Sequence, residues 1–557
     1  MTAEALHAPA EDGGEKSYLT EGWTLTSWIF STDHKRIGIL YAVSITVFFF
    51  IGGAAATLMR IQLFEPHNTF VSASTYNRLF TMHGVIMVWF FLVPSIPATL
   101  GNFLIPLMVG AKDVALPKLN LLSWWLYVIG ALFTVACLIS GGADTGWTFY
   151  TPYSTLYSNA SVLAAAAGVF VVGFSSILTG VNMITTVHML RAPGLTWFRL
   201  PLFVWGIYAV SLVMVLATPV LAMALLMIIV ERLGLPIFDP RFGGDPVLFE
   251  HIFWFYSHPA VYIMILPAMG LVSEVITAEA RRRVFGYKAM VVALLAISAL
   301  GFVVWGHHMF VAGQSPYASL VFSFLSFIIA VPSAIKVFNW TATLYRGEIR
   351  FRAPMLYCLG FIGLFTIGGL TGLFLASVPI DVQVHDTYFV IAHFHYIMVG
   401  GTVSAYFAGL HFWWPKITGR MYSEWWAKFS AVCMFLGFNF TFFPQYISGY
   451  LGQPRRYYQY PDQYQIYNVM SSTGAVVLAV AYLLPLVYLT VSLFRGEKAV
   501  ANPWNATGLE WQTTSPPPRE NFRSQPHVTN DPYDYHDPAI GPQAANEPPR
   551  QPQGIVP

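Results

Sequence analysis

The sequence predicts an all-α membrane protein, a polytopic bundle of twelve transmembrane helices. Hydrophobic residues make up 56% of its 557 residues, and charged residues only 10%. This composition, together with many apolar runs of about 20 residues or more, is not that of a soluble enzyme. Only helices and closed barrels satisfy the backbone hydrogen bonds in lipid, and runs this long and uniform indicate helices.

The expected spans are 37–60, 80–109, 121–141, 161–189, 200–230, 249–276, 286–312, 317–345, 354–378, 387–413, 425–450 and 469–494. Most lysines and arginines fall in the connections on one side of these spans. The connections on the other side carry only Arg60, Arg78, Arg232, Arg241, Arg455 and Arg456. By the positive-inside rule, both termini are therefore expected in the cytoplasm.

Three regions follow from this pattern. Residues 1–30 read as a polar cytoplasmic segment without the apolar stretch of a signal peptide, and residues 31–498 form the twelve-helix domain. Residues 499–557 read as a cytoplasmic tail rich in Pro, Asn and Gln, extended and without a core of its own. The cysteines lie in apolar runs and are expected to be small buried side chains: Cys137, Cys358 and Cys433.

Two adjacent histidines, His307 and His308, interrupt an apolar run and are the strongest functional signal. Polar rings are costly in a membrane and usually mark a working site. The side chains of adjacent residues on a helix point about 100° apart. The two rings can therefore share a target only if that target is a metal that both imidazoles reach. Otherwise one of the rings has another purpose. Further apolar runs contain His83, His258, His393 and His395. These six imidazoles together predict ligands of first-row metals or haem.

The spacing of the histidines indicates two kinds of centre. His258 and Tyr262 share a helix face because they are four residues apart, and His258 with the adjacent pair makes a three-imidazole set that suits copper. His393 and His395 lie on opposite flanks of one helix. One of them would form a bis-histidine haem with His83, and the other would leave a five-coordinate haem with an open face. Such a haem facing a three-histidine copper is an oxygen-reducing arrangement.

These residues resemble those of subunit I of the haem–copper oxidases, in particular the cytochrome c oxidases of the aa3 and caa3 kind. The resemblance covers nearly the whole chain, from Ser31 to Pro518. The motifs that carry it are His258-Pro-Ala-Val-Tyr262, Trp305-Gly-His-His308, His385-Asp-Thr-Tyr, Ala392-His-Phe-His395 and Pro454-Arg-Arg456. Together they are specific to that family.

The resemblance implies ligands for three cofactors. His83 and His395 would ligate the low-spin haem a, at which electrons arrive, and His393 would be the proximal ligand of haem a3. Tyr262 would be covalently joined to His258 and would donate an electron and a proton when the O–O bond breaks. Copper B would be bound by His258, His307 and His308.

The resemblance also implies a setting and partners. The chain would be the catalytic subunit of a terminal oxidase in the bacterial inner (cytoplasmic) membrane, oxidising cytochrome c, reducing O2 to water and pumping protons. Its partners would be a subunit II with a dinuclear copper centre, subunit III, small subunits and membrane lipid, but no nucleic acid. Cytochrome c would be separate or fused to subunit II.

Two proton routes are implied by the family pattern. Lys336 lies several residues inside an expected span, where a lysine with its stem snorkelling to the interface is the ordinary alternative. It matches the K-channel lysine of the family, and Ser333 stands where a threonine is common. Asp113, otherwise a solvated loop carboxylate, resembles the D-channel entrance. The channel lining of the family is matched by Asn102, Asn120, Ser176 and Asn182.

One position departs from the family pattern. The D channel usually ends at a glutamate in His-Pro-Glu-Val-Tyr, but this chain has Ala260 there. Tyr256 and Ser257 precede the motif, and Tyr256 lies on the same helix face as Ala260, four residues earlier. This resembles the branch of the family in which a Tyr-Ser pair replaces the glutamate. A phenol is a poorer free acid than a carboxyl, so we expect it to relay protons through its hydrogen bonds.

On the outer side, several residues resemble groups around the haem edges and bound ions. His385 and Asp386 resemble ligands of a magnesium shared with subunit II, and Arg60 resembles the arginine beside the haem a formyl group. Gln62 stands where relatives often have a calcium-binding glutamate, so an outer calcium site is in doubt. Arginine binds carboxylates in a bidentate way, which suits the propionate groups of haem. The residues that resemble the family's propionate surroundings are Arg455, Arg456, Trp147 and Asp381.

Three other functions compete with this interpretation. A quinol oxidase of the same superfamily tends to lack the His-Asp pair at 385–386, and a nitric oxide reductase uses iron and glutamates and lacks the tyrosine that Tyr262 supplies. A transporter would explain twelve spans but not the paired histidines. Haem A bands in a reduced-minus-oxidised spectrum would favour the cytochrome c oxidase, and haem b bands the other oxidoreductases. The polar quinol-site residues are replaced here by Ile51, Ala55, Thr75 and Arg78.

Overall fold

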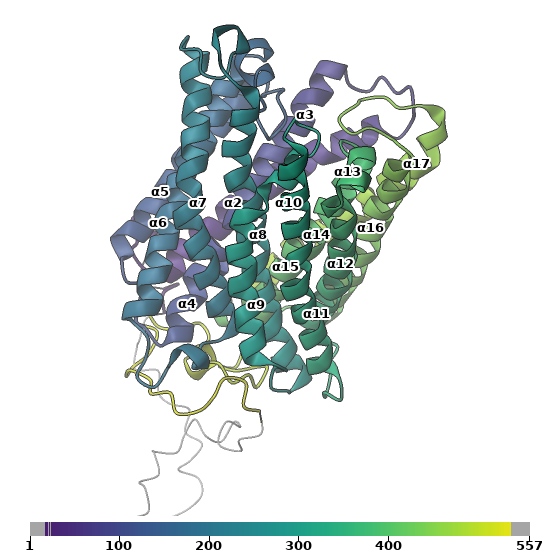
Figure 1. Cartoon of the computed structure of the whole chain (residues 1–557). Coiled ribbons are helices and arrows are strands. Elements are labelled where there is room, and N and C mark those ends of the chain that lie inside the picture. The colour runs from purple at the N-terminus through teal and green to yellow at the C-terminus, as the bar shows by residue number, and fades with distance from the viewer. Residues whose placement is uncertain (1–16, 21, 23, 536–557) are drawn as a thin grey trace, which may run out of the picture.

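The computed structural model describes residues 17–20, 22 and 24–535, and every regular element of this described part is helical. The long helices run roughly along one common axis, so that their ends form two opposite faces (Figure 1). Strand-like pairing within the same residues is limited to isolated bridges. One bridge joins Ser17 to Pro518, which places the start of the described chain beside its tail at one end of the bundle.

The α-helices are α1 (Leu25–Ile29), α2 (His34–Gln62), α3 (Ala73–Val85), α4 (Asn102–Val109), α5 (Pro117–Ile139), α6 (Ser161–Met189), α7 (Leu202–Arg232), α8 (Pro246–Ala280), α9 (Tyr287–Leu300), α10 (Pro316–Ile328), α11 (Ala330–Leu344), α12 (Ala353–Ala376), α13 (Val378–Val384), α14 (Tyr388–Ile397), α15 (Ser404–Thr418), α16 (Glu424–Tyr450) and α17 (Gln465–Arg495). The wider turns of π-helix, which often occur at functional sites, are Ile86–Leu92, Ser95–Gly101, Tyr153–Tyr157 and Met398–Val403. Short 3₁₀ turns are Trp197–Arg199, Pro240–Phe242, Gly301–Val303, Trp305–Met309, Asp462–Tyr464 and Leu509–Gln512.

Ten helical stretches of the described residues are long and apolar enough to cross a membrane. They coincide with ten of the expected spans, including the stretch from α3 through α4 and the stretch from α10 through α11. The other two expected spans fall on α9, which gives way to 3₁₀ turns at Gly301, and on α14 through α15, where His393 and His395 lower the apolar content. The twelve-helix count and the cytoplasmic termini stay predictions.

Local sequence signals explain where several helices begin and end. Asp33 caps α2 by accepting a hydrogen bond from the Lys35 amide at 2.8 Å, and Asp245 caps α8 in the same way. Helix α4 ends at Gly110, whose φ of 75° lies in the left-handed region that glycine adopts without strain. This turn leads the chain into the loop that carries Asp113.

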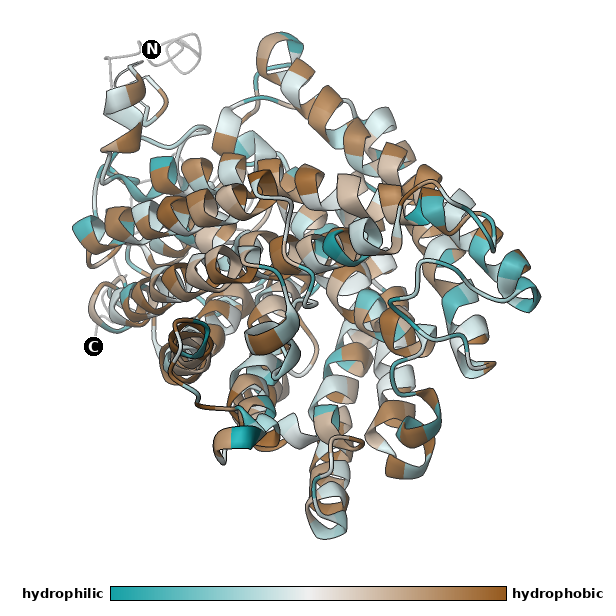
Figure 2. Cartoon of the chain, turned by 90° about the horizontal axis from the view of Figure 1, so that it is seen from above, coloured by the Kyte–Doolittle hydropathy of each residue, from teal (hydrophilic) through white to brown (hydrophobic). Residues whose placement is uncertain are grey.

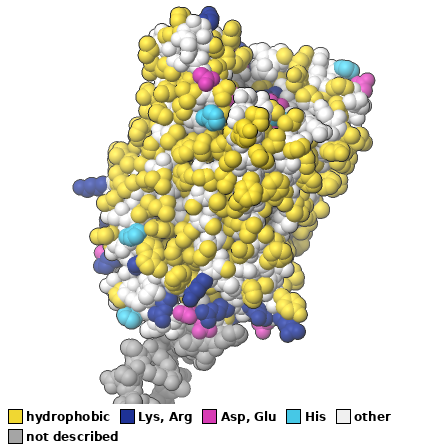
Figure 3. Space-filling model, in the orientation of Figure 1, with side chains coloured by type: hydrophobic (Ala, Val, Ile, Leu, Met, Phe, Trp, Pro, Cys, Tyr) yellow, Lys and Arg dark blue, Asp and Glu magenta, His cyan; other side chains and the backbone are white. Residues whose placement is uncertain are grey.

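Hydrophobic residues recur all along the helices of the bundle (Figure 2), and many large ones, such as Leu132, Phe324 and Val487, are exposed. In the space-filling view the hydrophobic surface is continuous between two ends, and charged side chains gather near those ends (Figure 3). A surface of this kind is suited to lipid, because a protein in water rarely exposes so large an apolar area. Helix α8 is the most enclosed of the long helices and is packed by α7, α11 and α15.

Close helix contacts depend on glycine at one clear place. A Cβ atom added to Gly130 of α5 would lie 2.7 Å from the carbonyl oxygen of Gly168 of α6, and one added to Gly168 would lie 2.9 Å from that of Gly130. Any larger residue would push the two helices apart. Small residues allow this backbone approach, which membrane helices use for packing.

The described part of the expected tail, 499–535, lies against the helical bundle. Trp504, Trp511 and Tyr533 are buried within the main hydrophobic core, and the Lys416 ammonium donates to three tail carbonyl groups at 2.7–3.2 Å. The tail therefore buries its aromatic side chains in the bundle. The outer parts of the two terminal regions lie outside the described residues, namely 1–16, 21, 23 and 536–557.

Candidate metal centre

His258, His307 and His308 form a cluster of imidazoles, in which His258 is buried and His307 and His308 are partly buried. The ring centroid of His307 lies 4.4 Å from the ring centroid of His258 and 4.4 Å from that of His308. The centroids of His258 and His308 are 5.3 Å apart. One nitrogen from each ring lies within 4.8 Å of the others, so a single ion can contact all three. Within the described part of the chain, the buried Nε2 of His258 has no hydrogen-bond partner. Because an unpartnered buried nitrogen is costly, this donor set fits a metal that prefers imidazole, such as copper.

The three histidines do not come from one α-helix, since His258 belongs to α8. His307 and His308 lie in a 3₁₀ turn after α9, where successive side chains are about 120° apart rather than 100°. The His308 ring stacks on Trp254 of α8, with a centroid distance of 3.7 Å and an angle of 7°. Nδ1 of His307 lies 2.8 Å from the hydroxyl of Ser326 on α10. These contacts fix both ring orientations.

Tyr262 lies directly beside the cluster. Its ring centroid is 4.8 Å from that of His258, as expected for residues four apart on α8. The tyrosine ring also packs against Gly301, where an added Cβ would come within 2.7 Å of it. Glycine at this position therefore makes room for the phenol next to the histidines.

His83 of α3 and His395 of α14 face each other as a second histidine pair. Their ring planes are within 9° of parallel, and their centroids are 6.4 Å apart. A metal–imidazole bond measures about 2.0–2.1 Å. Two such bonds, plus the distance from each nitrogen to its ring centre, account for the separation. The pair fits the two axial positions of one haem iron.

Each histidine expected to bind haem turns its Nδ1 toward a backbone carbonyl. A carbonyl oxygen only accepts, so Nδ1 must hold the proton and Nε2 keeps its lone pair for a metal. His411, another buried histidine, has both nitrogens within 2.7 Å of protein partners, as a structural histidine should. The accepting carbonyls are those of Gly52 for His83 at 2.9 Å, Gly368 for His393 at 3.0 Å and Ile391 for His395 at 2.8 Å.

His393 is directed to the other flank of α14, toward α12. Its Nδ1 also lies 3.2 Å from the hydroxyl of Thr371, which in turn lies 2.8 Å from the Tyr446 hydroxyl. Gly372 packs against the same ring, where an added Cβ would be 3.0 Å from the His393 Cε1 atom. Thr371, Tyr446 and Ser326 were missed by the sequence reasoning, because they lie on other helices and share no local motif with the histidines.

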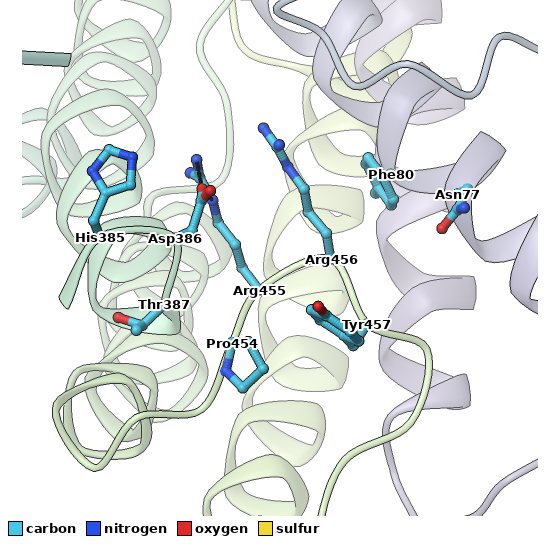
Figure 4. A pocket seen from close by; sticks show the side chains of 9 residues that line it. All are labelled: Asn77, Phe80, His385, Asp386, Thr387, Pro454, Arg455, Arg456 and Tyr457. Atoms are coloured by element: carbon cyan, nitrogen blue, oxygen red, sulfur yellow. Dashed lines mark hydrogen bonds and ion pairs between the residues drawn. The ribbon is translucent and has the colours of Figure 1, made fainter. Parts of the chain in front are cut away.

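A cavity of about 480 Å³ opens at the end of the bundle opposite the tail. Arg455 donates from Nε to Asp386 at 2.7 Å, and the Arg456 guanidinium lies 6.0 Å from the Phe80 ring centroid. Burial would raise the pKa of Asp386, but Arg455 and Arg456 hold it below its usual range, and burial lowers the pKa of Arg456 to about 10. Two guanidinium groups here suit an anionic group such as a carboxylate. The lining residues (Figure 4) are Asn77, Phe80, His385, Asp386, Thr387, Pro454, Arg455, Arg456 and Tyr457.

The remaining outer residues are held by protein partners. His385 Nδ1 lies 3.2 Å from an Asp381 carboxylate oxygen. Arg60 donates to the backbone and side chains of α17 at 2.9–3.4 Å. Trp147 packs closely against α3, since a Cβ on Gly84 would lie 2.9 Å from it. Trp147 thus lies against Gly84, the residue that follows His83.

Gln62 is fully buried, and both the oxygen and the nitrogen of its side-chain amide form hydrogen bonds. Its oxygen accepts from the Val71 amide at 2.8 Å, and its nitrogen donates to the carbonyls of Asn68 at 2.6 Å and Tyr458 at 2.9 Å. Calcium requires oxygen ligands, and here the amide NH₂ group already occupies two carbonyl oxygens. This arrangement agrees with the doubt about an outer calcium site.

Lys336 of α11 is fully buried rather than extended to the membrane surface. Its Nζ lacks a hydrogen-bond partner among the residues the structure describes and lies 5.2 Å from the Trp340 ring centroid. Ser333 lies one turn earlier and donates to the Ile329 carbonyl at 2.9 Å. An amine without protein partners in this position calls for water beside it.

Polar side chains extend inward from the Asp113 loop. Asp113 accepts from the Val114 amide at 2.7 Å, and burial raises the pKa of its carboxyl to about 7. Asn182 accepts from the Leu116 amide at 2.9 Å. Buried polar atoms without protein partners are usually satisfied by internal water. In the described part of the chain, such atoms include Oδ1 of Asn102, both side-chain polar atoms of Asn120 and Oγ of Ser176.

Tyr256 is buried on α8, two residues before His258. Its ring stacks on Trp89 with a centroid distance of 5.6 Å, and the Thr218 hydroxyl lies near its phenol. The hydroxyls of Ser257 and Thr218 are buried and, as far as the described residues extend, have no geometric hydrogen-bond partner. The unpartnered Thr218 hydroxyl near this phenol fits a bound water molecule.

The chain is similar to known proteins along most of its length. Residues 36–477 match the family model for cytochrome C and quinol oxidase polypeptide I. The chain is 45% identical over 514 residues to cytochrome c oxidase subunit 1 of Synechocystis sp., covering 92% of this chain and 93% of that protein. It is 42% identical over 538 residues to cytochrome c oxidase subunit 1 of Cereibacter sphaeroides, covering 90% and 95%. Its fold is similar to a cryo-EM structure of a haem–copper terminal oxidase dimer, with a TM-score of 0.72, 20% identity, and 93% and 89% coverage.

A helical membrane bundle that encloses a histidine pair and a three-histidine cluster has the architecture of the haem–copper oxidases. The chain belongs to the family of cytochrome c and quinol oxidase polypeptide I. It is a multi-pass membrane oxidoreductase of the respiratory oxidase class. The family binds haem and copper and works with subunit II and further subunits. The family and the enzyme class predicted from the motifs are thereby confirmed.

Proposed function

We propose that this chain reduces O2 to water at a haem a3–copper B centre and couples the reaction to proton pumping. The observation that carries the proposal is the cluster of His258, His307 and His308 beside Tyr262. These histidines would hold copper B, which with haem a3 supplies the redox chemistry when bound. Trp254 keeps the His308 ring in place by stacking.

The directions of the remaining rings support the proposed haem ligands. His83 and His395 would hold a low-spin haem a, and His393 would hold haem a3 on the opposite flank of α14. Their Nδ1 hydrogen bonds to carbonyls leave each Nε2 as a ligand atom. Haem A or a variant of it is the proposed macrocycle.

Protons would reach the centre by two routes. Tyr262 would lose a proton and an electron during O–O cleavage, and Lys336 with Ser333 would return protons to this region. Asp113 would admit protons to the second route, with Tyr256 and Ser257 at its inner end in place of a glutamate. The buried polar atoms along both paths, which lack protein partners in the described residues, support bound water there.

The outer end of the bundle would meet the partners. Arg455, Arg456, Trp147 and Asp381 would surround the haem propionates, and Arg60 would lie beside the haem a formyl group. His385 and Asp386 would bind Mg²⁺ at the contact with a subunit II that carries a dinuclear copper centre. Electrons would come from cytochrome c, and the complex would lie in a bacterial inner membrane.

The reduced-minus-oxidised spectrum of the purified complex tests this proposal. Haem A bands together with oxidation of reduced cytochrome c are expected. Haem b bands with quinol oxidation would instead indicate a quinol oxidase, the second candidate within the same family. Retention of the His385–Asp386 pair favours the first candidate.

A further inference from the structure

Asn521 lies in the tail, far along the chain from Asp113, yet it contacts the two residues directly before that carboxylate. Its side chain is fully buried. Nδ2 donates to the carbonyl of Ala111 at 2.9 Å and to the carbonyl of Lys112 at 3.2 Å. Both hydrogen bonds hold the backbone that leads into Asp113.

The same amide joins the tail to the start of α2. Its Oδ1 accepts from the Lys35 ammonium at 2.9 Å, and its Nδ2 lies 2.9 Å from Nε2 of His34. The Lys35 ammonium also donates to the Arg519 carbonyl at 2.8 Å. Because an ammonium only donates and carbonyls only accept, these partners fix the orientation of the amide. One side chain thus connects three segments of the chain.

The Asp113 carboxylate therefore lies among charged groups from three elements. Lys35 is paired with Asp33 at 3.2 Å, and the exposed Lys112 is paired with Glu520 at 2.6 Å. Besides burial, the Asp33 charge raises the pKa of Asp113 and the Lys35 charge lowers it. The titratable or charged groups around the carboxylate are Asp33, His34 and Lys35 at the start of α2, Lys112 on its own loop, and Arg519 and Glu520 on the tail.

We propose that Asn521 is a positioning residue for proton entry, through which the tail holds the Asp113 loop in its uptake conformation. The inference rests on the proposed role of Asp113 as the entrance of a proton route. It assigns a function to a segment that composition alone describes as extended. Asn521 acts through the backbone of Ala111 and Lys112 and does not itself carry the proton.

The backbone at Asn521 makes a clean test possible. Its φ of 64° lies in the left-handed region, so Asn521→Gly removes the amide without adding backbone strain. Asn505 of the same tail has a φ of 53° and an exposed side chain. Asn505→Gly is therefore a matched control, with the same chemical change in the same segment and the same backbone conformation.

The experiment measures proton uptake by the purified complex with a pH-indicator dye after reduced enzyme is mixed with O2, across a pH series. Asn521→Gly should slow uptake by about tenfold, because two hydrogen bonds to the loop together contribute a factor of that order. Its apparent pKa of uptake should fall, since a loosened loop exposes the Asp113 carboxylate to water. Asn505→Gly should match the unmodified enzyme in both rate and pH profile.

A second variant separates loop positioning from docking of the tail. Asn521→Asp keeps an acceptor for Lys35 but turns a carboxylate oxygen toward the Ala111 and Lys112 carbonyls. We expect the tail to stay docked, as judged by protease resistance, while uptake remains slow. Normal uptake in Asn521→Asp, or an unchanged rate and pH profile in Asn521→Gly, would overturn the inference.

Asp113→Asn distinguishes this inference from the function on which it rests. If Asp113→Asn leaves uptake unchanged, the proposed proton entrance itself is wrong, and the positioning role falls with it. If Asp113→Asn slows uptake but Asn521→Gly does not, only the role of Asn521 is refuted.

Discussion

The ring of His83 lies parallel to the ring of His395, with 9° between their planes and 6.4 Å between their centroids. The two residues come from α3 and α14, and a carbonyl hydrogen bond to Nδ1 fixes each ring. Helix spacing alone left open whether His393 or His395 faces His83, and the family resemblance favoured His395. The structure places His395 opposite His83 and directs His393 toward α12.

Replacing His83 should remove the low-spin haem. In His83→Leu one axial ligand is lost, so we expect the low-spin haem band to disappear from the optical spectrum. His411→Leu is the matched control, since both nitrogens of that histidine have protein partners. The control should lose about 1–3 kcal/mol of stability through an unpaired buried hydroxyl and keep the band. A normal low-spin band in His83→Leu would refute the ligand assignment.

Removing the amine of Lys336 should slow reduction of the high-spin haem. Electrons that enter a low-dielectric site need compensating protons, and a positioned proton-transfer group contributes about 10²–10⁴-fold to rate. Rapid mixing with reductant should therefore show slow haem a3 reduction in Lys336→Met. Lys428→Met, at a partly exposed lysine paired with Glu424, should reduce at the normal rate. Equal rates in both variants would make Lys336 a structural residue.

Tyr256 should be required where the family usually has a glutamate. Tyr256→Phe keeps the ring and its stacking on Trp89 but removes the hydroxyl. Oxygen reduction and pumping should both fall, because protons must move against roughly 2.3 kcal/mol per charge per 100 mV. Adding Ala260→Glu to this variant should recover part of each activity, since a carboxyl one turn away can reach the same region.

Tyr127→Phe provides the control for that experiment. Tyr127 is also buried and donates to the Phe90 carbonyl at 2.7 Å, so its loss should cost about 1 kcal/mol of stability without affecting pumping. A Tyr256→Phe enzyme that pumps at the unmodified ratio and rate would show that protons pass by water alone.

Asp113 should titrate near neutral pH. Burial raises the pKa of its carboxyl to about 7, so the group is mostly protonated at pH 6 and mostly ionised at pH 8. Infrared difference spectra between these pH values should contain a protonated-carboxyl band that Asp113→Asn removes. Asp462→Asn, at an exposed carboxylate, should leave the band unchanged. Persistence of the band in Asp113→Asn would assign it to another group.

Raising the pH should also weaken folding through this residue. The folded state holds the Asp113 proton more tightly than the unfolded chain does. The protonated Asp113 carboxyl therefore stabilises the folded state fully below its ordinary pKa of about 3.9. This stabilisation is lost as the pH rises to about 7. Asp113→Asn should flatten that part of the stability curve.

The sequence predicted the features that depend on local patterns. Apolar runs located the long helices, and costly histidines inside them located the cluster of His258, His307 and His308. The pairing of His83 with His395 came only from the family resemblance, because α-helical periodicity places His393 and His395 on opposite flanks without saying which neighbour each flank meets. The 3₁₀ turn at His307 was also missed, since short turns leave no period to detect.

Contacts between distant segments were beyond local patterns altogether. Ser326 reaches His307 from α10, and Thr371 reaches His393 from α12, but single hydroxyl residues in apolar helices carry no signal of their own. The tail lacks apolar periodicity, yet it buries Trp504 and Asn521. Its order comes from the bundle surface and from buried lysines that donate to its backbone, as Lys416 does.

The copper content of His308→Asn tests the central claim most directly. Three imidazoles set the geometry of the proposed copper site, so losing one should empty or distort it. The variant complex should lack the copper that is bound by this chain and fail to reduce O2, while the low-spin haem spectrum stays normal. Full copper content with normal oxygen reduction in His308→Asn would contradict the account.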